Sequence, residues 1–287
     1  MECVKLSNTT LEVTSYYGDY EYLLMPDVHF DNPKCQRDIF FRWMDQAKER
    51  GAKVIFNGDF FCLMEGRYDP RRSRTGIRPE YNKNSYLDLV INDAAEQLMP
   101  YAQNILFFGE GNHENKIRQH LDTDPLQRLC ERINMATGSK IYKMGYSGFV
   151  LFKYRQGKEL AGTITKVLYF HHGRYGGTIT KGTIGTMRHG AVAPDADVIL
   201  TGHTHDHWSM EIPRYRVGLK TGEVRIDTQI HLKVGTLKEE FAHMDGWAVE
   251  KIVLPKSIKG WWMRHTYSRS KKQVKNKDVH ISYEPTN

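Results

Sequence analysis

Length, composition and charge narrow the class of protein. The chain has 287 residues, long enough to bury a substantial core, and its 40% hydrophobic and 26% charged residues exclude disordered, collagen-like and coiled-coil proteins. No apolar run approaches the roughly 20 residues of a membrane-spanning helix, and the N-terminus lacks the apolar segment of a secretory signal, so we expect a cytoplasmic protein without membrane contact. The four cysteines are widely spaced without a C-x-x-C pair, which predicts free thiols.

The first predicted unit is a strand, a helix and a second strand. Residues 21–26 form a short apolar run that predicts a buried strand. A helical pattern follows, for which Asn32 would be the N-cap and Gly51 the stop signal, before a second apolar strand begins at residues 53–56. Such a βαβ unit predicts that its two strands are parallel.

The alternation of helix and strand continues before the chain becomes rich in β-structure. Residues 86–99 predict a helix and residues 105–108 a third strand. Further strands are expected at four places: 167–170, 198–200, 224–234 and 247–254. The later strands predict a second sheet packed on the first. We expect one catalytic domain over residues 1–255 and a basic, aromatic extension over 256–287 that is packed on it or continuous with it. Trp261 and Trp262 in that extension are expected core residues of a closing strand.

Polar motifs follow five of the predicted strands. They are D-x-H at 27–29, G-D at 58–59, G-N-H-E at 111–114, H-G at 172–173 and G-H-T-H at 202–205. Ligands of open α/β sheets bind at the carboxyl ends of the strands, so these motifs should converge. Carboxylates and neutral imidazoles form a donor set for two divalent cations roughly 3.5–4 Å apart. The sequence therefore predicts a dinuclear metal site.

This ordered series resembles the calcineurin-like metallophosphoesterases, over about residues 23–207. The resemblance implies an α/β fold of two packed mixed β-sheets flanked by helices, a four-layer αββα sandwich. It also implies a metal-dependent phosphoric ester hydrolase in which a metal-activated hydroxide attacks the phosphate. Mixed nitrogen and oxygen ligation disfavours Ca²⁺, and the family favours two Mn²⁺ ions, with Fe, Zn²⁺ or Ni²⁺ as alternatives.

The resemblance assigns roles residue by residue. Three side chains would hold the first metal: Asp27, His29 and His205. Three would hold the second metal: Asn112, His172 and His203. Asp59 would bridge the two ions. His113 would be the catalytic group that contacts the phosphoryl oxygen or protonates the leaving oxygen.

Two of these assignments meet a complication in the sequence. His171 and His172 are adjacent, and neighbours on a strand point to opposite faces, so only one should face the metals; we assign His172 because it precedes a glycine. Cys62 stands where many relatives carry an aspartate that orients the catalytic histidine. His113 must then find another partner, for which Glu114 is a candidate, and the protein is a poor match to a protein phosphatase.

Basic segments near the predicted site suggest the substrate. Four of the arginines in a basic insertion after the predicted bridging aspartate are candidates to bind phosphates: Arg71, Arg72, Arg74 and Arg78. Arg174, which follows the H-G motif, is a further candidate. With the net charge of +7, they favour a nuclease-like phosphodiesterase acting on nucleic acid. The alternatives are a phosphomonoesterase, a phosphodiesterase of small or cyclic nucleotides, and a metal-binding scaffold without turnover. A solvated loop with incidental charge would explain the same arginines.

Overall fold

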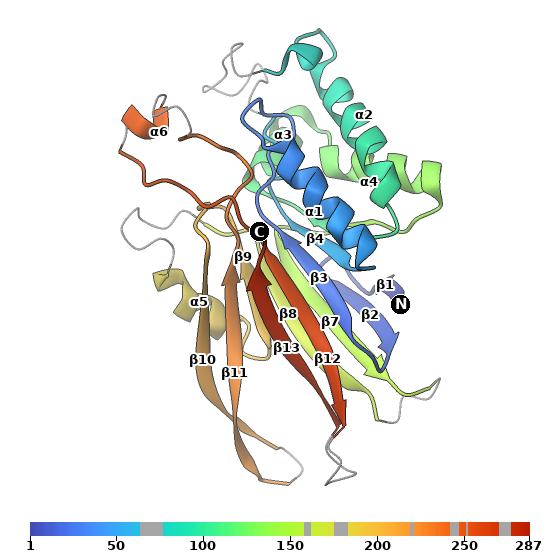
Figure 1. Ribbon diagram of the computed structural model, residues 1–287, viewed down its shortest axis with the longest axis vertical. Helices are drawn as coiled ribbons and strands as arrows, with labels where there is room; N and C mark the ends of the chain where they lie inside the picture. The colour runs from blue at the N-terminus through green and yellow to red at the C-terminus, as the bar shows by residue number, and fades with distance from the viewer. Residues whose placement is uncertain are drawn as a thin grey trace.

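Two β-sheets pack face to face in the computed structural model (Figure 1). The structure describes residues 1–63, 77–157, 162–174, 183–218, 221–241, 247–250, 252–269 and 277–287. Within them, one sheet has the strand order β13-β12-β3-β4-β5-β6 and the other the order β1-β2-β7-β8-β9-β11-β10.

The six-stranded sheet contains the predicted βαβ unit. Its strands are β3 (Tyr20–Met25), β4 (Lys53–Asn57), β5 (Ile105–Gly109), β6 (Tyr142–Lys143), β12 (Trp261–Arg269) and β13 (Lys277–Pro285). β3 to β6 run parallel, whereas β12 lies antiparallel to β3, so that a strand from the end of the chain completes a sheet begun near its start. Trp261 and Trp262 of β12 are buried, as predicted.

The seven-stranded sheet is also mixed. Its strands are β1 (Glu2–Lys5), β2 (Thr10–Tyr16), β7 (Ser147–Arg155), β8 (Ile164–His171), β9 (Val198–Thr201), β10 (Trp208–Val217) and β11 (Val224–Lys233). β8, β9 and β11 run parallel to one another, while β10 pairs antiparallel with β11 at the edge. The predicted strands at 167–170, 198–200 and 224–234 are therefore confirmed.

Helices cover the outer faces of both sheets. The described helices are α1 (Arg37–Glu49), α2 (Tyr86–Leu98), α3 (Asn112–Leu121), α4 (Pro125–Thr137), α5 (Ile184–Val192) and α6 (Trp247–Glu250), with short 3-10 turns at Pro79–Tyr81 and Met99–Tyr101. α1 to α4 pack on the six-stranded sheet, and α5 lies over the seven-stranded one (Figure 1). The four layers confirm the predicted αββα sandwich. None of the described helices is both long and apolar enough to cross a bilayer.

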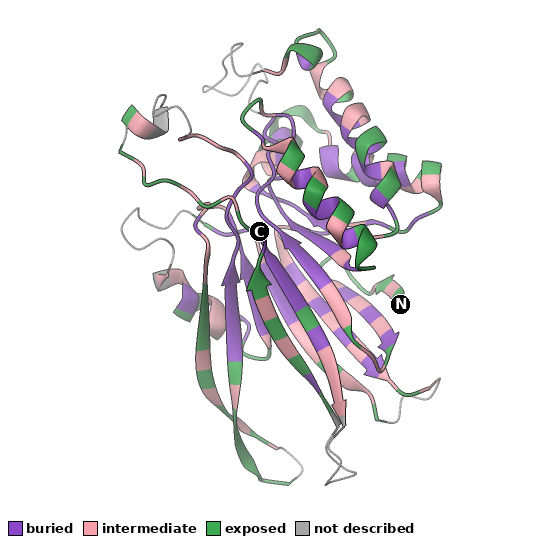
Figure 2. Ribbon diagram, viewed as in Figure 1, coloured by how far each residue is buried: buried purple, intermediate pink, exposed green. Residues whose placement is uncertain are grey.

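The core lies in two main layers, because the strands of the six-stranded sheet alternate their side chains between its two faces. One layer fills the space between the sheets, with Tyr22, Phe107 and Phe152 among its largest members. The other lies under α1 to α4, where the rings of Phe56 and Phe108 stack 4.4 Å apart. The buried segments concentrate along the strands and the inner faces of the helices (Figure 2).

Two sequence predictions about local structure were wrong. α1 begins at Arg37 rather than after Asn32, because the Asn32 side chain closes a turn by accepting from the Lys34 backbone N–H, and Cys35 pairs with Lys238 in a β-bridge. The segment 247–254 contains the short helix α6 rather than a strand. It lies outside both sheets, so its backbone bonds locally, with Ile252 N donating to Val249 O.

Candidate metal centre

Five strand ends meet at one edge of the sandwich. Backbone contacts join them: Val28 N and His29 N donate to the Asp59 carbonyl, and Gly202 N donates to the His172 carbonyl. The segments after β3, β4, β5, β8 and β9 thereby bring together the seven predicted ligands and the predicted catalytic histidine: Asp27, His29, Asp59, Asn112, His113, His172, His203 and His205.

The first donor group comes from the ends of β3 and β9. One donor atom each of Asp27, His29 and His205 lies within 4.8 Å of the others. The Nε2 atoms of His29 and His205 are 3.1 Å apart, and His205 Nε2 is 3.4 Å from Asp27 Oδ2. The His203 backbone N–H also donates to Asp27 Oδ2 and fixes the orientation of this carboxylate.

The second donor group comes from the ends of β4, β8 and β9 and from the start of α3. Donor atoms of Asp59, His172 and His203 lie within 4.8 Å of one another. His172 Nε2 is 3.1 Å from both Asp59 Oδ2 and Asn112 Oδ1. His172 Nδ1 donates to the Asn57 carbonyl at 2.9 Å, which directs Nε2 into the group, the arrangement that orients metal-binding imidazoles.

The unpaired donor atoms fit divalent cations. Two imidazole nitrogens 3.1 Å apart can share only one proton, yet those of His29 and His205 also face the Asp27 carboxylate. Among the described residues, Asp27 Oδ1, His29 Nδ1 and His203 Nδ1 are buried without a hydrogen-bond partner. Because buried polar atoms are almost always paired, such a concentration of lone pairs matches the oxygen and nitrogen set that divalent metals bind.

The backbone is strained at the same residues. His29, Asp59, His203 and His205 have positive φ angles of 51°, 48°, 71° and 59°. A non-glycine residue in this left-handed region costs on the order of 1 kcal/mol or more, and such residues cluster at functional sites. The glycine in front of α3 meets a different demand: a Cβ on Gly111 would lie 2.1 Å from Asp59 Oδ1.

The structure separates the two adjacent histidines. His172 is fully buried and faces Asp59 and Asn112. The ring of His171 lies 5.1 Å from that of His189 on α5, and its Nδ1 accepts from the Gly173 backbone N–H. Because consecutive side chains of a strand alternate, His171 is directed away from the donor groups, and His172 is the one that the structure places among them.

Comparisons with known proteins agree with this arrangement. The sequence profile described as calcineurin-like phosphoesterase matches residues 21–207, more than half of the chain and every motif of the site. The chain belongs to the calcineurin-like phosphoesterase family. A sequence comparison with characterised proteins gave no match.

Three solved structures that are similar to this calcineurin-like chain share little sequence with it. Vps29 from Chaetomium thermophilum is 10% identical, with 94% of this chain and 97% of that one covered at a TM-score of 0.34. The same protein complexed with a cyclic peptide has a TM-score of 0.28 at 10% identity, covering 93% and 96%. A hypothetical protein from Thermus thermophilus is 12% identical, covering 92% and 100% at a TM-score of 0.30.

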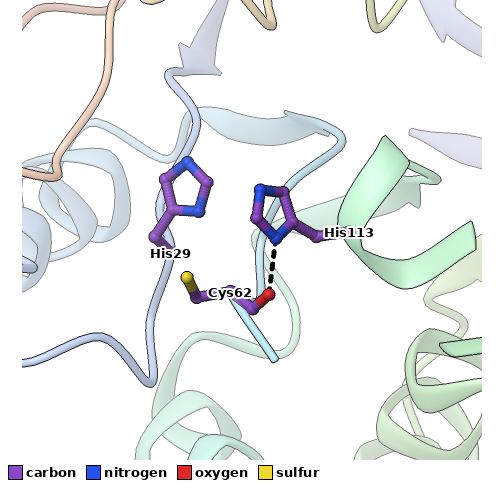
Figure 3. Close-up of side chains that lie close together, drawn as sticks. All are labelled: His29, Cys62 and His113. Carbon is purple, nitrogen blue, oxygen red and sulfur yellow. Dashed lines mark hydrogen bonds between the residues drawn. The ribbon is translucent and has the colours of Figure 1, made fainter. Parts of the chain in front are cut away.

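The predicted catalytic histidine of this family member has a main-chain partner. His113 Nδ1 lies 2.5 Å from the backbone carbonyl oxygen of Cys62, and because a carbonyl only accepts, Nδ1 must donate (Figure 3). His113 Nε2 is 3.8 Å from Asp59 Oδ2. Glu114, the candidate partner from sequence, was the wrong choice. Its buried carboxylate accepts instead from the backbone N–H groups of Asp59, Phe61 and Gly111.

Burial and mutual charge set the protonation of the cluster. Burial would raise the pKa of Asp59, but the His172 and His113 imidazoles hold it well below its usual range. Burial and the neighbouring imidazoles lower the pKa of His29 well below normal and that of His203 to about 4. Burial opposes, but Asp59 and Asp27 outweigh it and raise the pKa of His172 to about 10. The raised pKa of His172 keeps a proton on that imidazole, which a cation bound at Nε2 must displace.

Two further carboxylates shape the site. Burial and the Asp59 charge raise the pKa of Glu114 to about 8. The buried Asp31, which the sequence analysis missed, accepts from Cys62 N at 2.6 Å, Leu63 N at 2.9 Å and Tyr86 Oη at 2.6 Å. Asp31 thereby holds the carbonyl that orients His113. An acidic residue two positions after His29, in the segment that follows a predicted strand, was the signal that could have found it.

Only two of the five predicted substrate arginines lie among the described residues. Arg71, Arg72 and Arg74 lie outside the described residues. Arg78 donates from Nε to the Asn32 carbonyl and from Nη2 to the Cys35 carbonyl, so its guanidinium holds the segment before α1. Arg174 is exposed two residues after His172. A role toward substrate stays a prediction for all five.

Proposed function

We propose that the protein is a dinuclear metal-dependent phosphodiesterase that cleaves nucleic acid. The observation that carries the proposal is the meeting of two donor groups, Asp27-His29-His205 and Asp59-His172-His203, at one sheet edge in a member of a phosphoesterase family. The Asp59 carbonyl accepts from the backbone that carries His29, while its carboxylate lies 3.1 Å from His172, so Asp59 joins the two groups.

In this proposal, each of two cations has its own ligands. Asp27, His29 and His205 would hold one, and Asn112, His172 and His203 the other, with Asp59 as the bridging carboxylate. Mn²⁺ is the proposed metal because the family favours it, with Fe, Zn²⁺ or Ni²⁺ as alternatives, and the mixture of nitrogen and oxygen ligands disfavours Ca²⁺. Two such cations, when bound, supply Lewis acidity that activates water and neutralises charge on the phosphate.

The protein's own groups divide into a buried floor and an accessible rim. Asp27, His29, Asp59 and His172 are buried and keep the donor positions fixed. The His205 side chain is 18% exposed and that of His113 11%, so a phosphate ester reaches the site from their side. This separation suits hydrolysis, since the floor stays rigid while the rim meets substrate.

His113 is positioned for proton transfer to the leaving oxygen. Its Nδ1–H is committed to the Cys62 carbonyl, so Nε2 is the nitrogen that would meet substrate. With Nδ1 protonated, Nε2 can give up a proton only from the imidazolium form, and the carboxylate of Asp59, 3.8 Å away, stabilises that form. His113 would therefore act as a general acid when protonated and as a hydrogen-bond acceptor when neutral.

Nucleic acid is the proposed substrate because of charge. The net charge of +7 favours encounter with a polyanion, and the exposed Arg174 follows directly on the donor groups. A phosphomonoesterase or a phosphodiesterase of small or cyclic nucleotides would use the same metal-binding residues. A scaffold without turnover is disfavoured because the donor set is complete.

One side-by-side assay tests the proposal. The Mn²⁺-loaded protein is incubated with labelled single-stranded and double-stranded DNA, RNA, cyclic dinucleotides and p-nitrophenyl phosphate. We expect cleavage of nucleic acid that stops when a chelator is added. Cleavage of the monoester alone would overturn the nuclease assignment, and turnover of none of the substrates would favour the scaffold.

A further inference from the structure

A thiol lies against the catalytic cluster. Donor atoms of His29, Cys62 and His113 are all within 4.8 Å of one another, which makes a third group distinct from the two assigned to the dinuclear centre (Figure 3). Cys62 is 3% exposed and belongs to the turn after β4, whereas His29 follows β3 and His113 begins α3. Three separate elements thus present one sulfur and two imidazoles to a common point.

His29 has one ring nitrogen in each group. Its Nε2 faces His205 at 3.1 Å. Its Nδ1 is buried and has no hydrogen-bond partner among the described residues. Figure 3 shows the nitrogen next to the substituted ring carbon on the side of the Cys62 sulfur. A buried nitrogen without a partner is rare, and this one is directed at the thiol and at His113.

The other two members each present a defined donor atom. The His113 Nδ1–H is taken by the Cys62 carbonyl, which makes Nε2 the ligating nitrogen. The Cys62 sulfur receives a hydrogen bond from Asn32 Nδ2 at 3.4 Å. Burial and the Asp31 charge outweigh this bond and raise the pKa of the Cys62 thiol to about 12, so the metal itself must displace the thiol proton. The three donor atoms lie within 4.8 Å of one another. A bound metal ion is about 2.3 Å from a sulfur ligand and 2.0–2.1 Å from a nitrogen ligand, so the donor atoms would have to approach one another by up to about 1 Å.

Sulfur changes which metals the group selects. A thiolate with two imidazoles is a set for thiophilic ions such as Zn²⁺ and Cd²⁺, whereas carboxylates with imidazoles suit Mn²⁺. We propose that His29, Cys62 and His113 form a thiophilic metal site that captures Cd²⁺ and inhibits the enzyme. On binding, the Cys62 thiol loses its proton to solvent as the sulfur–metal bond forms.

Inhibition follows from the sharing of two residues and rests on the proposed function. A neutral imidazole has one lone pair, so an ion on His29 Nδ1 and an ion on His29 Nε2 exclude each other. The thiophilic ion also occupies Nε2 of His113, the nitrogen that would meet the leaving oxygen. Thiophilic ions should therefore inhibit more weakly as the Mn²⁺ concentration rises.

Cadmium binding tests the site without any activity measurement. The metal-free protein is titrated with Cd²⁺ while the ultraviolet sulfur-to-metal charge-transfer band is followed. We expect one equivalent to produce the band in the wild type. Cys62→Ser should abolish it and weaken Cd²⁺ binding by at least about 100-fold, since even residues that only orient ligands are worth 10–100-fold in affinity. Cys3→Ser, which changes a free thiol on β1, should leave the band intact.

Each outcome decides the inference. A band that persists in Cys62→Ser, that disappears in Cys3→Ser, or that is absent from the wild type would overturn it. If Cys62→Ser fails to fold by circular dichroism, His113→Gln decides: weaker Cd²⁺ binding supports the site, and unchanged binding refutes it. A missing band with intact Mn²⁺-dependent turnover would refute only this site, whereas a Cys62-dependent band without turnover of any substrate would refute only the proposed function.

Discussion

His113 Nδ1 donates to the backbone carbonyl oxygen of Cys62 across 2.5 Å. Position 62 carries a thiol where many relatives carry an aspartate, so the group that orients the His113 imidazole is a main-chain carbonyl. No side-chain substitution removes a carbonyl, but the residues that hold it can be changed. Asp31, which accepts from the Cys62 and Leu63 backbone N–H groups, is the residue that fixes it.

Asp31→Asn should therefore weaken the positioning of His113, because Asp31 holds the Cys62 carbonyl that accepts from it. An amide offers one acceptor oxygen where the carboxylate offers two, so at least one of the buried N–H groups of residues 62 and 63 loses its partner. We expect the free energy of unfolding to fall by about 1–3 kcal/mol in urea denaturation. Turnover should fall as well, because the Cys62 carbonyl shifts. Asp195→Asn, at an 88% exposed side chain, is the matched control; equal stability of both variants would contradict the role of Asp31.

His113→Gln should separate chemistry from metal binding. His113 is outside both proposed ligand sets of the dinuclear centre, so metal content should stay at the wild-type level. Turnover of bis-p-nitrophenyl phosphate should drop by about 10²–10⁴-fold, the usual contribution of proton transfer. His120→Gln, at an exposed position on the same helix, serves as the control. Loss of metal together with activity would assign His113 to the ligands instead.

Asp59→Asn should remove metal and activity together. Asp59 is 2% exposed, and its Oδ2 lies 3.1 Å from His172, so an amide there both lowers the negative charge and can present an N–H to the cations. Elemental analysis of the purified variant and the same turnover assay measure the two losses. Asp195→Asn again controls for the loss of one charge. A variant with the full metal content and full turnover would show that Asp59 bridges nothing.

Gly111→Ala should disrupt the site through a single methyl group. A Cβ at Gly111 would lie 2.1 Å from Asp59 Oδ1 and 2.2 Å from Asp59 N, closer than atoms can approach. The bridging carboxylate must then move, and we expect loss of bound metal with a lower midpoint of thermal unfolding. Gly157→Ala adds a methyl group with no heavy atom within 4 Å and should behave as the wild type. Normal metal content in Gly111→Ala would refute the close approach.

His265 should make stability depend on pH. It is 1% exposed, its Nδ1 lies 2.5 Å from Tyr154 Oη, and burial together with Lys166 lowers its pKa from 6.5 to about 3. The folded state therefore keeps His265 neutral while the unfolded chain takes up a proton below pH 6.5. The stability present above pH 6.5 is lost as pH falls toward 3.

Urea unfolding at two pH values measures this contribution. Between pH 7.5 and 5, His265 should account for about 2 kcal/mol of lost stability. His265→Phe has no proton to take up and should lose correspondingly less over the same interval. Tyr154 Oη keeps Tyr22 Oη as a partner at 3.1 Å in the variant. Identical pH dependence of wild type and variant would show that His265 does not titrate between the two states.

Much of the fold and of the donor set was predictable because both depend on local patterns. An apolar run followed by a polar motif fixes both a strand and the position of the residues at its end. When strands are parallel, those ends meet without any further information. This is why Asp27, Asp59 and Asn112 could be placed together from their motifs. Strand alternation showed that only one of His171 and His172 could face the site, and the glycine after His172 selected it.

The errors arose where a segment's partner is distant in sequence. Asn32 has the composition of a helix cap, but Cys35 pairs with Lys238, which delays α1 to Arg37. The segment at 247–254 has an apolar pattern, but it finds no strand edge and turns into α6. Local sequence does not record which distant backbone will be available to pair.

The sequence by itself predicted the candidate donor residues, because their identity and their order after apolar strands are present in the chain. Only the tertiary structure decided how those donors are held. The His113 partner is a carbonyl, its support is Asp31, and a thiol faces the unpaired nitrogen of His29. The reason is physical: backbone carbonyls are the same at every residue, so their role depends on where folding places them, which composition and spacing do not encode.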